Sequence, residues 1–98
     1  MDNKQQEPSL KLTTGWVPIE VISEPSVILT FKGYAPVIKV TAIRTGLRYL
    51  LYISAKSLAT GLEELRKQNA GKFSGLRFEI RKDGLERTSR YELRSIRD

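Results

Sequence analysis

Apolar and polar residues alternate along much of this chain with a period of two, which is the pattern of half-buried β-strands. The alternation predicts strands over residues 16–22 and 27–31. Pro25 lies between them, cannot donate a hydrogen bond to a neighbouring strand and disfavours helical geometry at Glu24. The two runs are therefore interpreted as one kinked strand, followed by a loop over residues 32–36.

The most informative pattern is a pair of β-rich runs, residues 37–44 and 47–54, on either side of Thr45-Gly46. A two-residue turn at these positions predicts a β-hairpin in which Val40 opposes Leu51. Because side chains alternate across a sheet, this register sorts them into two faces. The apolar face, expected to form the core, holds Ile38, Val40, Ala42, Tyr49, Leu51 and Ile53. The opposite face is mixed in chemistry and holds Val37, Lys39, Thr41, Ile43, Arg48, Leu50 and Tyr52.

Helical spacing follows this hairpin. Leu58, Leu62 and Leu65 recur at i, i+4 and i+7 and predict a helix whose apolar stripe faces the sheet. A second hairpin then closes the chain, with a turn at residues 82–85 and a return strand over residues 86–93. Its first strand alternates the inward residues Leu76, Phe78 and Ile80 with Arg77, Glu79 and Arg81, which are expected to form a solvated, salt-bridged face.

Five strands with one helix between the third and fourth is the element order of the OB-fold, a small and partly open Greek-key barrel. The chain resembles the single-stranded DNA-binding OB domains of phages, plasmids and archaea. The residues that carry the resemblance are GLRYLLY at 46–52, the helix with Leu58, Leu62 and Leu65, GLRFEI at 75–80, KDG at 82–84 and YEL at 91–93. The resemblance implies a mainly β fold, a five-stranded OB-like barrel with one helix between strands three and four.

The same elements are also compatible with an α+β sheet that carries one helix and is not closed into a barrel. In either architecture the 98 residues suffice for one domain and one core. We expect a flexible N-terminal tail over residues 1–14, a binding domain over residues 15–94 and a short C-terminal tail over residues 95–98.

The charge of the chain is basic and uneven. The net charge is +6, and residues 27–69 alone carry seven basic and two acidic side chains. A basic surface favours polyanions through counterion release, although charge alone does not separate DNA, RNA and anionic lipid. The chain has no cysteine, no signal-peptide pattern and no run near the roughly 20 apolar residues that cross a membrane. A soluble, cytoplasmic protein without a membrane partner is therefore expected.

Composition argues against catalysis. The chain has no histidine, so imidazole bases, serine triads and histidine-ligated metals are unavailable. The acids inside the predicted fold, Glu79, Asp83 and Glu86, lie among arginines and lysines that would pair with them. No glycine-rich phosphate loop or dinucleotide motif occurs either. We therefore expect a protein that has no enzymatic activity and binds neither a cofactor nor a metal ion.

OB domains bind ligands on the face of strands two and three, flanked by the loops between strands one and two and between strands four and five. The resemblance therefore implies a nucleic-acid site formed by Lys32, Tyr34, Lys39, Thr41, Arg48, Leu50, Tyr52, Lys82 and Arg87. Its aromatic rings would stack on bases while lysine and arginine follow the phosphates. Structural roles stay open for Tyr52 as a cross-strand partner, for Tyr34 as a loop anchor and for Trp16 as a core residue.

The expected function is non-catalytic binding of single-stranded nucleic acid, with DNA favoured over RNA. The alternative is a protein–protein interaction module, or a small phage or plasmid regulator, that uses the same face. Val37, Ile43 and Leu50 would then be its apolar contacts. A homo-oligomer stays open. A duplex-DNA architectural protein would need a minor-groove wedge, which the sequence does not reveal.

Overall fold

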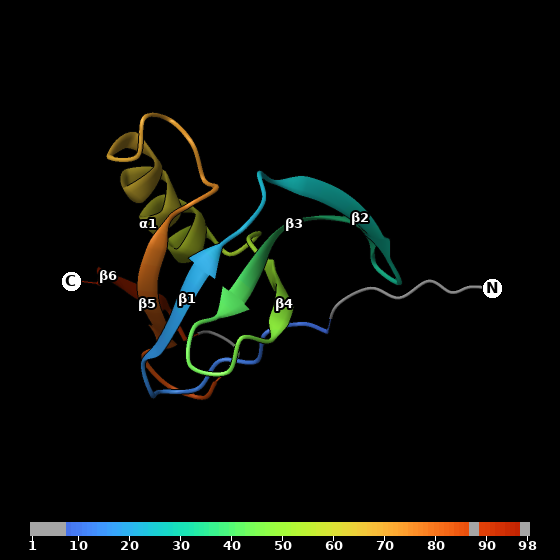
Figure 1. Cartoon of the computed structure of the whole chain (residues 1–98). Helices are drawn as coiled ribbons and strands as arrows, with labels where there is room; N and C mark the ends of the chain where they lie inside the picture. The colour runs from blue at the N-terminus through green and yellow to red at the C-terminus, as the bar shows by residue number, and fades with distance from the viewer. Residues whose placement is uncertain (1–7, 87–88, 97–98) are drawn as a thin grey trace.

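The structure is a computed structural model, and it describes residues 8–86 and 89–96. The elements, in chain order, are β1 (Val17–Val21), β2 (Ser26–Thr30), β3 (Gly33–Ala42), β4 (Arg48–Tyr52), α1 (Lys56–Lys67), β5 (Arg77–Lys82) and β6 (Tyr91–Ser95) (Figure 1). The six strands form one sheet, and every paired strand is antiparallel to its neighbour. The mainly β class and the helix after the first hairpin are confirmed.

Six strands are found where the sequence predicts five, because the predicted kinked strand is interrupted. Val21 of β1 pairs with Val40, and Ser26 of β2 pairs with Val37. Val37 and Val40 both have β4 on their other side, so β1 and β2 follow one another along the same edge of β3. Pro25 lies in the break between them.

The sheet is not closed into a barrel. Between residues 8 and 96, apart from the two undescribed residues 87 and 88, no strand pairing joins β4 to β6. The outer edge of β4 is occupied instead by the N-terminal segment. Leu50 donates its N–H to the carbonyl of Pro8, and Leu10 donates its N–H to the carbonyl of Leu50, both at 2.8 Å. These bonds use backbone groups that barrel closure would need.

The fold includes part of each predicted tail. Within the predicted N-terminal tail, residues 8–13 are held by the fold, since Leu10 and Leu12 also pack against the core and Thr13 accepts a hydrogen bond from Lys82. Residues 1–7 lie outside the described residues. At the other end, residue 95 is the last residue of β6, and residues 97 and 98 lie outside the described residues.

The prediction of a loop over residues 32–36 is wrong. Only Phe31 and Lys32 form the turn, and β3 begins at Gly33, opposite Thr30. Pro36 is tolerated inside β3 because its nitrogen faces the side where β4 has ended, while its carbonyl accepts a hydrogen bond from Ile53 at 3.1 Å. Figure 1 shows that β2 and the start of β3 project from the rest of the sheet. We call residues 26–36 the arm and the remainder the body.

The predicted hairpin of β3 and β4 has the right faces and the wrong register. Val40 pairs with Tyr49 rather than with Leu51, a shift of two residues that keeps every side chain on its predicted face. The turn is longer than predicted because Ala42 accepts a hydrogen bond from Gly46 at 2.7 Å. Ile43 donates its N–H to Pro18 of β1, at 3.0 Å, so it continues the pairing of β3 with β1 past the end of the strand.

The core lies between the inner face of the sheet and α1. Its buried residues are Ile19, Val21, Ile38, Val40, Leu51, Leu58, Leu62, Leu76, Phe78 and Ile80. Tyr49, Ile53 and Leu65 pack at its margin, so the predicted apolar face and helical stripe are confirmed. Gly61 allows α1 to approach β6, since a Cβ atom there would lie 3.2 Å from Leu93.

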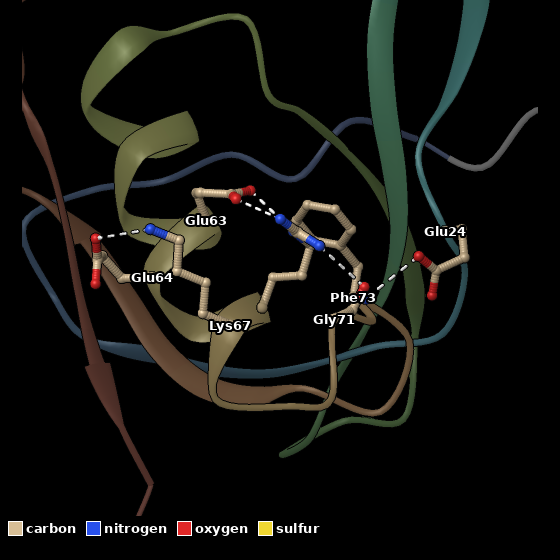
Figure 2. Close-up of polar contacts among 7 residues, drawn as sticks. Glu24, Glu63, Glu64, Lys67, Gly71 and Phe73 are labelled. Atoms are coloured by element: carbon tan, nitrogen blue, oxygen red, sulfur yellow. Dashed lines mark hydrogen bonds and ion pairs between the residues drawn. The ribbon is translucent and has the colours of Figure 1, made fainter.

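A polar anchor holds the break between β1 and β2 to the loop that follows α1. The carboxylate of Glu24 accepts a hydrogen bond from the N–H of Phe73 at 3.3 Å (Figure 2). It accepts another from the N–H of Ser74 at 2.8 Å. Arg66 of α1 lies over the Phe73 ring, 5.8 Å from its centroid, and donates to the carbonyl of Gly71. The base of the arm is therefore tied to the body through a side chain as well as through the sheet.

Candidate functional site

The face of β3 and β4 that points away from the core carries the predicted mixture of residues. Lys39 opposes Leu50, and Thr41 opposes Arg48. Lys39 and Arg48 are exposed, whereas Thr41 is half-buried. The closest acidic residue in the sheet is Glu20 of β1, which lies opposite Thr41. This outer face therefore presents two basic side chains on neighbouring strands.

Two aliphatic residues of the outer face are buried. Leu50 is 4% exposed and Val37 is 1% exposed, although neither belongs to the core cluster. Each lies directly opposite a longer side chain, Lys39 and Tyr52 respectively, that can cover it. Leu50 thus supports the face instead of presenting a contact surface. The apolar contacts that the alternative function would need here are reduced to the half-buried Ile43.

A hollow of about 420 Å³ lies where the arm joins the end of β4. It brings together three predicted site residues: Lys32 from the turn, Tyr34 from β3 and Tyr52 from β4. Phe31 from the turn also lines it and is fully exposed. The turn needs Gly33, whose φ of 108° lies in a region that other residues rarely adopt.

Tyr52 also lines a second hollow, of about 320 Å³, between β4 and the start of β6. Lys82 and Tyr91 line it too, with the Lys82 ammonium 5.6 Å from the centroid of the Tyr91 ring. Lys11 contributes from the N-terminal segment. Tyr52 therefore separates two hollows that each contain a lysine and a further aromatic ring.

The predicted site residues fall into three groups. Lys32, Tyr34 and Tyr52 share the first hollow, and Lys82 joins Tyr52 in the second. Lys39, Thr41, Arg48 and the buried Leu50 lie on the outer face and line neither of these hollows. Arg87 lies outside the described residues.

Three cations of the candidate region differ from the paired arginines of α1, β5 and β6. Across β5 and β6, Arg81 bonds Glu92 at 2.8 Å and Arg94 bonds Glu79 at 2.6 Å, which confirms the predicted salt-bridged face. On α1, Arg66 pairs with Glu63, and Lys67 with Glu64. In residues 8–86 and 89–96, no ion pair involves Lys32, Lys39 or Arg48. These three charges are available to an external anion.

Trp16 lies outside the buried core cluster. The guanidinium carbons of Arg81 and Arg94 lie 4.6 Å and 4.1 Å from the centroid of its ring. Such contacts are favourable because the ring face carries partial negative charge. Trp16 is thus a partner of the salt-bridged face and is already stacked.

Sequence reasoning missed Phe31 and Lys11. Phe31 is the first residue of the Phe31-Lys32 turn, and an aromatic residue in a tight turn is badly placed for burial, so a signal existed. Lys11 gave no signal, because its role depends on the pairing of the N-terminal segment with β4.

Compared with protein-family models, curated proteins and solved structures, the chain matches none of them. Among the described residues, no group of three or more acidic side chains is placed to hold a metal ion. The one helix of that part of the chain is too short and too polar to cross a membrane.

Proposed function

We propose that this chain binds single-stranded nucleic acid, with DNA favoured over RNA, and that it does so without catalysis. One observation carries the proposal: Tyr52 lines two hollows that also contain Lys32 and Lys82, and the unpaired cations Lys39 and Arg48 lie on the same outer face of β3 and β4. Stacking on aromatic rings contributes about 1–3 kcal/mol per base, and unpaired cations neutralise the phosphates that follow.

The proposal includes an OB-like interpretation of the sheet. If β1 and β2 count as one kinked strand, five strands remain in the order that the resemblance implies. The N-terminal segment along β4 then lies where a closing strand pair would be. In this interpretation the arm corresponds to the loop between strands one and two, which flanks the ligand in OB domains.

A protein-binding module is the second candidate, and a specific observation favours it. The arm exposes Val27, Leu29, Phe31 and Tyr34, each by more than 60% of its surface. Large exposed apolar groups commonly mark contact surfaces. This candidate would use the arm, because Val37 and Leu50 on the outer face are buried.

The test is fluorescence anisotropy of a labelled single strand of mixed sequence, titrated with protein at several salt concentrations beside the matching duplex and the matching RNA. We expect preference for the single strand and an affinity that falls steeply with salt. Equal or tighter binding of the duplex, or no binding at moderate salt, would overturn the proposal.

Two matched pairs of variants locate the site. Tyr52→Ala should weaken binding by about 5- to 150-fold, the equivalent of about 1–3 kcal/mol, whereas Tyr52→Phe keeps the ring and should bind almost normally. Lys39→Glu should weaken binding much more than Lys72→Glu, which makes the same change of net charge in the loop after α1. Equal effects of the two charge reversals would mean that only the overall charge matters.

A further inference from the structure

The outer edge of β2 is a free strand edge. Lys39 accepts a hydrogen bond from Ile22, so odd-numbered residues of β3 direct their backbone groups toward β1 and β2. Ser26, Ile28 and Thr30 pair with three of those odd-numbered residues. Because backbone groups alternate along a strand, Val27 and Leu29 direct their N–H and C=O groups to the opposite side, where the described residues offer no further strand.

This edge lacks the features that usually block edge pairing. Natural edge strands carry charges, prolines or bulges that prevent another strand from adding. Residues 26–30 contain no charge and no proline. The side chains of Val27 and Leu29 are 63% and 68% exposed. The edge therefore offers unpaired backbone groups next to an exposed apolar surface.

We propose that two copies of this chain associate by antiparallel pairing of β2 with β2 of the second copy, about a two-fold axis at Ile28. In this register Val27 of each copy opposes Leu29 of the other, and these residues exchange their free backbone hydrogen bonds. The apolar side chains of the two pairs then lie beside one another on one face. The sheets of the two copies then form one continuous sheet.

The free edge of β2 is self-complementary, which favours a second copy of this chain as the strand that pairs with it. A two-fold interface brings the same patch of both chains together, and the two residues with free backbone groups are symmetric about Ile28. Shifting the axis to Val27 would require a donor from Pro25, and shifting it to Leu29 would use Phe31 of the turn. The same register also brings Lys32 of each copy toward Glu24 of the other, so the charges are complementary.

The association should depend on concentration. A five-residue strand pair is smaller than the roughly 1,200–2,000 Å² interfaces of stable complexes. Sedimentation velocity of the free protein, between about 10 μM and about 1 mM, should therefore show a monomer–dimer equilibrium. Because no nucleic acid is present, the outcome is independent of the proposed function.

Lysine substitution tests the surface. Leu29→Lys places a charge on the edge and should weaken association by about tenfold or more. Leu85→Lys is the matched control, since Leu85 is 75% exposed and lies in the turn after β5. A monomer at every concentration, or equal effects of the two substitutions, would overturn the proposal.

Cysteine substitution tests the register, because the chain has no cysteine of its own. In Ile28→Cys the two thiols would face each other across the axis, at a Cα separation of about 4.5 Å that suits a disulfide. In Val27→Cys they would be two residues out of register. We expect oxidation to link the first variant rapidly and the second slowly. Linking of Val27→Cys at the same rate, or no linking of Ile28→Cys, would contradict pairing about Ile28.

Discussion

β3 runs through two regions of the molecule, and its side chains are buried in one and exposed in the other. In the body, Ile38 and Val40 are fully buried beneath α1. In the arm, Tyr34 of the same strand is 78% exposed, and its partner Leu29 is 68% exposed. Both stretches alternate with the same period, but only the first has a helix to pack against. A β-pattern therefore fixes which side chains share a face, and the presence of another layer decides whether that face is buried.

The difference separates side chains that stabilise the fold from side chains that remain open to a partner. The body buries ten apolar residues in one cluster and pairs Arg66, Arg81 and Arg94 with glutamates. The arm and the outer face next to it expose aromatic rings and leave Lys32 and Lys39 unpaired. Groups that are already satisfied stabilise the fold, whereas unsatisfied groups remain available to a ligand.

The largest expected contrast is between two phenylalanines. Phe78→Ala in the body should lower the free energy of unfolding by about 3–5 kcal/mol, because it removes a fully buried ring and leaves a cavity. Phe31→Ala in the arm should change it by less than about 0.5 kcal/mol, because that ring is fully exposed. Urea unfolding monitored by circular dichroism measures both. A large loss in Phe31→Ala would mean that the arm is packed in solution.

A smaller effect is expected at the anchor between arm and body. Glu24→Ala removes the acceptor of two backbone N–H groups in the loop after α1 and should cost about 1 kcal/mol. Glu64→Ala is the control, since its carboxylate only meets Lys67 at 4.0 Å on the helix surface. Thermal unfolding compares the two. Amide exchange in β2 should also accelerate in Glu24→Ala alone, and unchanged exchange would show that the anchor does not hold the arm.

The smallest effect concerns pH. The hydrogen bond from Arg66 lowers the pKa of Glu63 below its ordinary value. A carboxylate with a depressed folded-state pKa stabilises the fold above its unfolded-state pKa, and this contribution disappears as pH falls through the lower, folded-state value. Wild type should therefore lose slightly more stability than Glu63→Gln between neutral and acidic pH. Identical profiles would show that this exposed pair contributes nothing.

Residue patterns predicted faces more reliably than register or loops. Alternation assigned Ile38, Val40 and Leu51 to the core correctly, because it depends only on neighbours along the chain. The register failed by two residues because the turn spans residues 43–46: Ala42 accepts a hydrogen bond from Gly46 and donates one to Leu47, whereas Thr45-Gly46 alone indicates a two-residue turn. The loop prediction failed because Pro36 lies where β4 has ended and no donor is needed.

The sequence predicted two aromatic residues of the candidate site, but it did not predict the burial of Leu50 or the contacts of Trp16. Lys32, Tyr34 and Tyr52 do share one hollow. Burial of Leu50 depends on cross-strand neighbours and could not be read from alternation, which placed it correctly on the outer face. The stacking of Trp16 on two arginines required the pairing of β5 with β6.

The most direct test of the central claim, that the arm and the outer face bind the proposed ligand while the buried core provides stability, is a ¹⁵N–¹H NMR titration with a single-stranded oligonucleotide. We expect the largest shift changes at Lys32, Tyr34, Lys39, Arg48 and Tyr52, with α1 nearly unchanged. Changes centred on α1 or on the salt-bridged face of β5 and β6, or no changes at all, would contradict the account.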